Sequence, residues 1–263
     1  MTLPRLSLPR AVTALAAAAF LLVALVTPLG EADAALPAKV TLTWYGQACF
    51  LIETATGTRI VVDPISKGLG YDLPVGLRAD AVTISHEHAD HNNVALVGGR
   101  PKILRGLTAD KKGWTKIDDR VKDVAVRSVG VYHDDKRGAE RGLNAVFIFE
   151  TAGLRIAHLG DLGHTLDDQQ LSAIGSVDVV LVPVGGHFTI DARQATRVLD
   201  QLHPRLVIVP MHYRTAVSTV TQLAPIDEFL TGKANVRRLE ANTLPITAIK
   251  SRPATEIVVM GWK

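Results

Sequence analysis

Cysteine is almost absent from this chain. Cys49 is the only one in 263 residues, so no disulfide can form within the chain. It stands in an apolar stretch, residues 48–52, which predicts a small buried hydrophobic side chain rather than a reactive thiol. A G-x-S-x-G nucleophile elbow is also lacking, so the sequence gives no support to covalent catalysis by a serine or cysteine nucleophile.

A strong excess of charge of either sign is lacking as well. The chain has 29 Lys and Arg against 26 Asp and Glu, for a formal net charge of +3. Its small charged clusters, residues 111–112 and 134–137, are typical of solvated turns rather than of a basic stripe. We therefore expect no nucleic-acid partner.

Only one long apolar run is present, at residues 11–26. Arg5 and Arg10 precede it, and Ala-Asp-Ala-Ala at residues 32–35 offers an A-x-A cleavage signal, so residues 1–34 are interpreted as a secretory signal peptide. The run is shorter than the ~20 residues that a spanning helix needs, which disfavours the alternative of an uncleaved anchor. Neither a lipoprotein cysteine nor a twin-arginine pair accompanies it. We expect a periplasmic or secreted protein without a stable membrane anchor.

Residues 35–263 contain no internal repeat, low-complexity tract or linker, and they suffice for a single domain with a sizeable core. Helical periodicity occurs at residues 166–174 and 191–202, where Asp167 and Asp191 can cap the helix starts, and a short helix is expected at 225–230. Strand-like runs occur at residues 39–45, 49–53, 59–62, 79–85, 102–104, 121–131, 143–150, 154–158, 177–184 and 206–210. Strands followed by helices in two halves predict an α/β fold of two packed sheets with helices outside.

Residue types that bind metals are densest in the stretch HEHADH. His86, His88, Asp90 and His91 lie there, directly after the predicted strand 79–85. Imidazole and carboxylate suit zinc, iron and manganese, and the loop at a strand end is where a scaffold presents catalytic groups. His86 and His88 can bind one ion together, while Asp90 and His91 are offset toward a second. A solvated polar turn is the alternative for the motif taken alone.

Three further candidates stand at strand ends. His133, Asp161 and His212 each follow a predicted strand closely, and glycines flank Asp161, so the backbone can turn sharply there. These strand ends are expected to converge on one edge of the sheets. For each residue alone, an ordinary polar loop position is the competing interpretation.

Several short motifs follow one another along the chain: HEHADH, a later lone His, a Gly-Asp after a strand, and Pro-x-His-Tyr. Their order resembles that of the metallo-β-lactamase fold superfamily of metal-dependent hydrolases. The segments WYGQACF (44–50), PVGG (183–186) and PMHYRT (210–215) are similar to the branch with ascorbate-6-phosphate lactonase-like and N-acyl-phosphatidylethanolamine phospholipase D-like proteins. The resemblance spans residues 40–260. It implies an αββα sandwich of two mixed β-sheets with helices on the outer faces.

The resemblance also implies two divalent metal ions, with zinc favoured over manganese or iron. Carried over to this sequence, the first ion is held by His86, His88 and His133, the second by Asp90, His91 and His212, and Asp161 bridges them. This chain departs from the pattern at Gln47, where relatives often carry His, and at His187, where they often carry an aromatic residue. Substrates of relatives therefore do not transfer directly.

The expected activity is hydrolysis of a small ester, lactone or phosphodiester by a metal-bridging hydroxide, since metal binding lowers the pKa of water to about 7. Asp90 is the candidate for orienting this hydroxide. His187, His164 and Tyr213 are candidates for proton donation or substrate contact, with second-shell hydrogen bonding as the alternative. Phosphate recognition favours Arg or Lys, and Lys67, Arg137, Arg141 and Arg214 are available.

Two other functions stay open at this point. One is a non-catalytic metal-binding or sensing protein that uses the same ligands. The other is an oxidoreductase with a di-iron centre, which is disfavoured because no flavin-binding or other electron-transfer segment follows the domain.

Overall fold

The computed structural model of the protein describes residues 1–2, 39–248 and 254–262. The predicted signal peptide lies outside the described residues, apart from its first two, and stays a prediction. Within the described part, no helix is both long enough and apolar enough to cross a membrane. All described residues from 39 onward belong to one unit, Leu36–Lys263.

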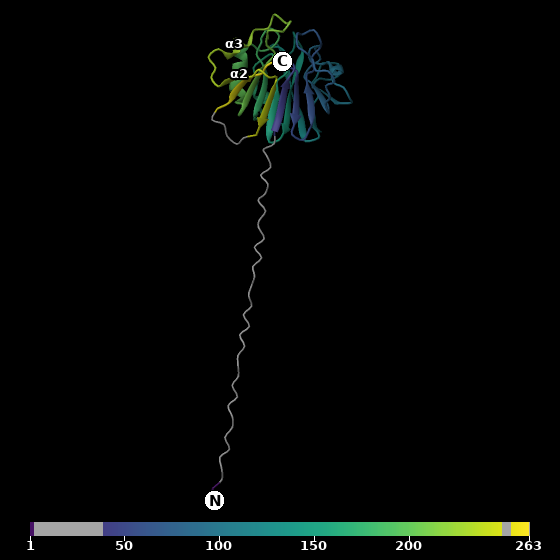
Figure 1. Ribbon diagram of the computed structural model, residues 1–263. Helices are drawn as coiled ribbons and strands as arrows, with labels where there is room; N and C mark the ends of the chain where they lie inside the picture. Colours follow the sequence, from purple (N-terminus) through teal and green to yellow (C-terminus); the bar gives the residue numbers. More distant parts are fainter. Residues whose placement is uncertain (3–38, 249–253, 263) are drawn as a thin grey trace. The chain divides into compact units, whose positions relative to one another are not determined.

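Two mixed β-sheets build this unit, as predicted (Figure 1). The first sheet has six strands in the order β13-β1-β2-β3-β4-β5. It opens as an antiparallel meander of β1, β2 and β3, and β4 and β5 then add in parallel to β3. Its strands are β1 (Lys39–Trp44), β2 (Phe50–Thr54), β3 (Arg59–Val62), β4 (Ala81–Ile84), β5 (Lys102–Arg105) and β13 (Thr243–Thr247).

The second sheet has eight strands in the order β12-β14-β11-β10-β9-β8-β7-β6. Strands β12, β14, β11, β10 and β9 run parallel to one another, whereas β8, β7 and β6 add in antiparallel fashion. The strands are β6 (Asp118–Val121), β7 (Val124–Tyr132), β8 (Leu143–Thr151), β9 (Leu154–His158), β10 (Val179–Pro183), β11 (Val207–Met211), β12 (Val236–Arg238) and β14 (Glu256–Val259).

Both longer helices begin where the sequence predicts. Helices α1 (Asp168–Ile174) and α2 (Ala192–Leu202) start after Asp167 and Asp191, and each aspartate forms a capping box with the glutamine three residues later. Helix α3 (Ile226–Leu230) is the predicted short helix, and Figure 1 labels it beside α2. All three bury apolar side chains in the main core. The caps and this burial together fix the helices against the second sheet.

The two faces of the first sheet are covered differently. Side chains alternate along β2, so Phe50 and Ile52 join the main core between the sheets, whereas Cys49 and Leu51 belong to a second apolar cluster. That cluster is completed by residues of the segments 63–80 and 85–97 on either side of β4, in which the 3-10 turn Val94–Leu96 is the helical element described. Helices cover the second sheet as expected, but an irregular segment takes their place on the first.

Two parts of the predicted strand pattern differ from the structure. The expected strand 121–131 is β7 over residues 124–131, but Val121 ends the separate strand β6, because Lys122 adopts a left-handed backbone (φ +52°) and the pair Lys122-Asp123 turns the chain between β6 and β7. Strands β12, β13 and β14 were not predicted. They are short, and β13 carries a proline, so their apolar pattern is weak and their pairing partners lie far away in the sequence.

The predicted burial of Cys49 is confirmed, since the residue is fully buried. Burial raises the pKa of its thiol to about 12, so the reactive thiolate is scarce at neutral pH. We expect a disulfide-exchange reagent to label one thiol per chain in denaturant and none rapidly in the native protein. Cys49→Ala serves as the blank. Rapid stoichiometric labelling of the native protein would contradict this packing.

Candidate metal centre

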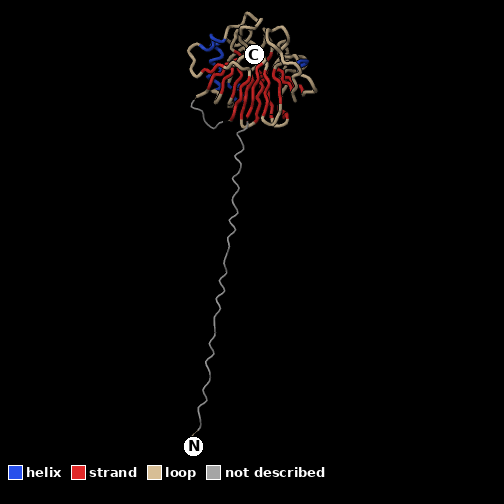
Figure 2. The backbone as a smooth tube through the Cα atoms, in the orientation of Figure 1, coloured by secondary structure: helices blue, strands red, loops and turns tan. Residues whose placement is uncertain are grey.

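The predicted site residues lie at strand ends that share one edge of the sandwich. Strands β3 and β4 are parallel to each other, as are β9, β10 and β11, and β7 runs in the direction of β9 because both are antiparallel to β8. Strands β3, β4, β7, β9 and β11 are each followed within three residues by a polar residue that the site uses. Figure 2 shows long loops gathered at one end of the strands. The expected convergence is therefore observed.

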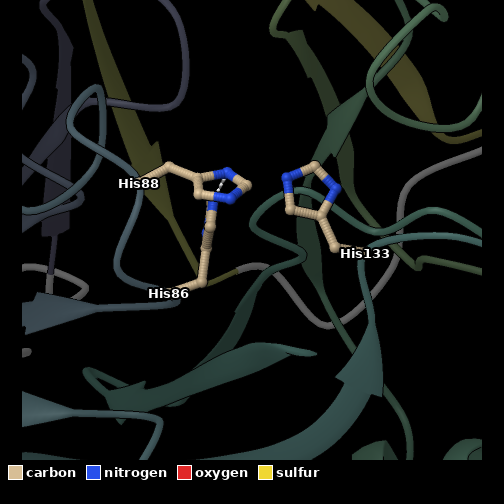
Figure 3. Close-up of side chains that lie close together, drawn as sticks. All are labelled: His86, His88 and His133. Atoms are coloured by element: carbon tan, nitrogen blue, oxygen red, sulfur yellow. Dashed lines mark hydrogen bonds between the residues drawn. The ribbon is translucent and has the colours of Figure 1, made fainter. Parts of the chain in front are cut away.

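Three imidazoles form the first cluster (Figure 3). His86 and His88 come from the loop after β4, and His133 reaches them from the end of β7 on the other sheet. Nε2 of His86 lies 3.0 Å from Nδ1 of His88, and the ring of His133 is 4.7 Å from that of His86 and 4.9 Å from that of His88. Nitrogen atoms of all three lie close enough together to hold one metal ion.

Asp161 occupies the centre of the whole arrangement. Its Oδ2 atom lies 3.3 Å from Nε2 of both His91 and His133, 3.4 Å from Nε2 of His212 and 3.9 Å from Nε2 of His86. A second group able to hold an ion consists of Asp90, His91 and His212. One carboxylate oxygen thus faces residues of both groups, which is the geometry that a bridging ligand requires.

Burial and mutual charge set the protonation of these groups. Burial lowers the pKa of His86, His88 and His212, which favours the neutral imidazole that binds metals. For Asp161, burial alone would raise the pKa, but the surrounding imidazoles, His212 first and then His91, hold it well below its usual value. Neutral imidazoles around an ionised carboxylate are the form of the donor set that a metal ion needs.

His91 and Asp90 show that the cluster attracts positive charge. Burial would lower the pKa of His91, yet Asp161, Asp63 and Asp90 raise it well above its ordinary value. Burial would also raise the pKa of Asp90, but its contact with His91 lowers it to about 2. Three carboxylates therefore face one imidazole, and either a proton or a metal ion can compensate them.

Unpaired polar atoms test whether this donor set fits a metal. Within the described residues, Nε2 of His91 and Oδ1 of Asp161 are buried without a hydrogen-bond partner, as are Nδ1 of His133 and Nδ1 of His212. Such atoms are rare in folded proteins and usually mark the place of an ion, a ligand or ordered water. Imidazole and carboxylate are the donors that zinc, manganese and iron bind. The residues therefore fit a metal centre.

Asp63 contacts the cluster from behind, and it was not among the residues predicted from the sequence. It follows β3, is fully buried, and accepts hydrogen bonds from the backbone nitrogen (2.7 Å) and Oγ (2.5 Å) of Ser85. Its Oδ2 also lies 2.9 Å from Nδ1 of His91, and Oγ of Ser85 lies 3.0 Å from Nδ1 of His86. Since Oγ donates its one hydrogen to Asp63, it accepts from His86. Both imidazoles thus carry their hydrogen on Nδ1 and turn Nε2 toward the cluster.

A signal for Asp63 exists in the sequence. The pair Asp63-Pro64 ends the apolar run 59–62, so this carboxylate stands at a strand end as His133 and Asp161 do. Asp63, His86 and His91 can also be grouped as potential ligands. Because the oxygens of Asp63 already accept three hydrogen bonds, its place is that of a support behind the two imidazoles.

The predicted proton donors are placed unequally. His187 is exposed and shares a hollow with His133. His164 uses both ring nitrogens on backbone groups, accepting from the nitrogen of Tyr132 and contacting the carbonyl of Thr165 (2.7 Å), so it has a structural role.

The structure does not support the predicted catalytic role of Tyr213. The residue is 2 % exposed, its ring packs 5.4 Å from that of Trp44, and burial raises the pKa of its hydroxyl. It is not among the residues that line the hollow over the cluster. The backbone of His212 is left-handed (φ +51°), which redirects the chain after β11. These contacts give Tyr213 a packing role instead of the expected catalytic one.

A hollow of about 480 Å³ opens over the cluster. Asp90, Asp161 and the exposed His88 contribute to its wall, so ligand candidates of both groups are reachable from solvent. The volume is within the range of small-molecule sites. The remaining lining residues are His133, Glu140, Arg141, Phe188, His212 and Val220.

Comparison with known proteins identifies the family. The model of the β-lactamase superfamily domain matches residues 41–212. A UPF0173 metal-dependent hydrolase from Anaeromyxobacter sp. (strain K) is 33% identical over 236 residues, which cover 77% of this chain and 85% of that protein. The chain belongs to the metallo-β-lactamase superfamily. It is a metal-dependent hydrolase of that superfamily, and its two mixed sheets are those of the metallo-β-lactamase fold.

Other relatives and solved structures agree with this assignment. A UPF0173 protein from Pyrococcus abyssi is 32% identical over 191 residues, covering 66% of this chain and 83% of that protein. A crystal structure of a metallo-β-lactamase superfamily protein from Thermotoga maritima has a TM-score of 0.66 at 36% identity and covers 84% of this chain and 98% of its own. The metallo hydrolase Igni18 from Ignicoccus hospitalis shares the fold, with a TM-score of 0.58 at 24% identity over 80% of this chain and all of its own.

Asp63→Ala tests the support beneath the two imidazoles. The variant loses the acceptor that holds Nδ1 of His91, so we expect affinity for zinc to fall about 10- to 100-fold, the usual effect of losing such a partner. Competition with a chromogenic chelator measures the affinity, and circular dichroism checks the fold.

Asp123→Ala is the matched control for this measurement. Asp123 also accepts hydrogen bonds from several side chains, those of Thr54, Thr56, Thr58 and Thr151, but it lies in the β6–β7 turn, away from the cluster. We expect its zinc affinity to stay that of the wild type. Equal affinities in Asp63→Ala and Asp123→Ala would argue against the support.

Proposed function

We propose that this enzyme is a binuclear metal hydrolase that cleaves a small ester, lactone or phosphodiester. The observation that carries the proposal is the position of Oδ2 of Asp161, within 3.3–3.9 Å of Nε2 atoms from four histidines. A single carboxylate between two groups of potential ligands favours two ions rather than one.

The first ion is assigned to His86, His88 and His133, the second to Asp90, His91 and His212, and Asp161 is assigned as the bridge. Charge supports this number of ions. Three carboxylates, Asp63, Asp90 and Asp161, surround His91, so two divalent cations would leave one positive charge, which one anionic ligand balances. Zinc suits this mixture of imidazole and carboxylate, with manganese and iron as the alternatives.

Divalent ions bound here supply Lewis acidity, which lowers the pKa of water and polarises the bond to be cleaved. The protein's own residues do the rest. Asp90 is ionised and lines the hollow, so it can accept a hydrogen bond from the attacking water and orient it. His187, exposed beside the hollow, is proposed to contact the substrate or to protonate the leaving group.

We also propose that the enzyme acts outside the cytoplasm, in the periplasm or as a secreted protein. This rests on the basic, apolar and small-residue pattern of residues 5–35.

Metal content of three variants tests the ligand assignment. We expect His88→Ala to bind one ion fewer than the wild type, because it removes a ligand of the first ion only. Asp161→Ala lowers the occupancy of both positions, because it removes the bridge. The measurement is elemental analysis by mass spectrometry after dialysis against a zinc buffer.

His203→Asn is the control for metal content. His203 is exposed at the end of α2, and asparagine tolerates its left-handed backbone (φ +45°), so two ions are expected to remain. A full complement of two ions in Asp161→Ala would refute the bridge.

A substrate screen tests the activity itself. The zinc-loaded protein is assayed with generic esters, lactones, phosphodiesters and β-lactams, before and after treatment with a chelator. We expect turnover of at least one of the first three classes, loss of that turnover on chelation, and recovery when zinc is returned. Inertness of the fully loaded protein toward all of them would favour a metal-binding or sensing protein instead.

A further inference from the structure

The loop between β7 and β8 is organised by one buried carboxylate. Asp134, which is 4 % exposed, directly follows His133. Its Oδ1 accepts hydrogen bonds from the backbone nitrogens of Lys136 (2.9 Å) and Gly138 (2.8 Å), and its Oδ2 accepts from those of Glu140 (2.9 Å) and Arg141 (2.7 Å). Four backbone groups that would otherwise be left to solvent are thus tied to one point. The loop therefore has a fixed shape that ends at Arg141.

Arg141 lies where the hollows beside the cluster meet. Its side chain lines the large hollow together with Asp161, and two smaller hollows with His88 and with His133. One guanidinium nitrogen donates to the carbonyl of His187 (2.9 Å), and the group lies 5.9 Å from the centre of the Phe188 ring. These contacts orient the planar guanidinium from one side, while other N–H groups of its five-donor fork stay available to a ligand.

One other basic residue, Lys111, lines a smaller hollow beside the cluster together with His88 and Arg141, whereas the remaining candidates are placed differently. Among the described residues that line the hollow over the cluster, Arg141 is the one Lys or Arg. Lys67, Arg137 and Arg214, the other candidates for anion recognition, are exposed, and Arg137 lines a different hollow with Tyr132 and Asp167. Arg105, near the cluster, is already paired with Glu87 at 2.7 Å.

Glu140 does not cancel this charge. Its Oε2 lies 3.8 Å from Nη1 of Arg141, a long contact between partly exposed groups, and its Oε1 pairs with Lys136. The guanidinium thus faces the hollow with its positive charge only weakly compensated. A guanidinium in this position is suited to a carboxylate or a phosphate oxyanion.

We propose that Arg141 is a specificity-determining residue, and that Asp134 positions Arg141. The group that Arg141 binds is an oxyanion, either a carboxylate or a phosphate, which the substrate carries beside the bond that is cleaved. This inference rests on the proposed hydrolase function and narrows its substrate class to small anionic molecules. The hollow of about 480 Å³ has room for such a molecule.

Equilibrium binding tests the proposal independently of turnover. Glutarate and inorganic phosphate are titrated into zinc-loaded protein by calorimetry, with metal content checked for each variant. We expect Arg141→Ala to bind at least one of the two anions about tenfold more weakly or worse, as the loss of a charge-assisted pair predicts, and Arg141→Lys to recover part of the affinity. The anion whose affinity falls identifies the group that Arg141 recognises.

Arg137→Asn is the matched control. It removes the same charge from the same loop, at an exposed left-handed position (φ +58°) outside the hollow over the cluster, so wild-type affinities are expected. Asp134→Asn loosens the loop but keeps the arginine, so an intermediate affinity with unchanged metal content is expected. The proposal would be overturned if Arg141→Ala bound both anions as tightly as the wild type does. It would also be overturned if the wild type bound neither anion.

Kinetics distinguish the failure of this inference from the failure of the proposed function. The substrates are 4-nitrophenyl hydrogen glutarate, the neutral 4-nitrophenyl pentanoate, and methyl 4-nitrophenyl phosphate. We expect Arg141→Ala to raise KM about tenfold for the anionic substrate that is turned over, with kcat less affected and the pentanoate reaction unchanged. An equal loss on the neutral ester contradicts the role of Arg141. Absence of turnover in all three contradicts the hydrolytic function, and calorimetry then decides the question of Arg141 alone.

Discussion

Two buried carboxylates, Asp63 and Asp161, are the constraint on which the site depends. Both are essentially excluded from solvent, and an ionised carboxylate costs several kcal/mol to bury unless opposite charge or hydrogen bonds compensate it. Asp63 is satisfied from within the fold by Ser85 and His91, whereas Asp161 retains a buried oxygen without a partner among the described residues. Asp63 thus fixes the orientation of the imidazoles. Asp161 keeps a negative charge that is not fully compensated, and a metal centre supplies the positive charge that compensates it.

Much of the site could be predicted because its residues carry a local signal. His86, His133 and His212 each stand at the end of an apolar run, and strand direction alone brings such ends to one edge of a sandwich. Asp63 has the same local signal, but its importance comes from contacts with Ser85 and His91, which lie 22 and 28 residues further along the chain. A role of that kind depends on register between strands, which a single sequence does not reveal.

The orientation of side chains after a strand was harder to predict than their position. Tyr213 stands next to His212, yet the left-handed backbone at His212 sends the two side chains to different surroundings.

In the fold, too, local features were easier to predict from the sequence than features that depend on distant residues. The capped helices α1 and α2 were predicted at their starts, because capping is local, whereas β12 to β14 depend on distant pairing partners. The covering of the first sheet by residues 63–80 and 85–97 follows from packing that only the structure displays.

The potential metal ligands and the proposed substrate-binding residues lie on different parts of the fold, and this affects how substrate specificity can change. The potential metal ligands leave the ends of paired strands, and their geometry is tied to the packing of the sheets. Arg141 and His187 instead lie on loops, held by the hydrogen bonds of Asp134 and by their contact with each other. A change in either loop can therefore alter what is recognised without disturbing the cluster. His187, where relatives are expected to carry an aromatic residue, lies on one of these loops, so we expect this departure to affect substrate choice more than the metal centre.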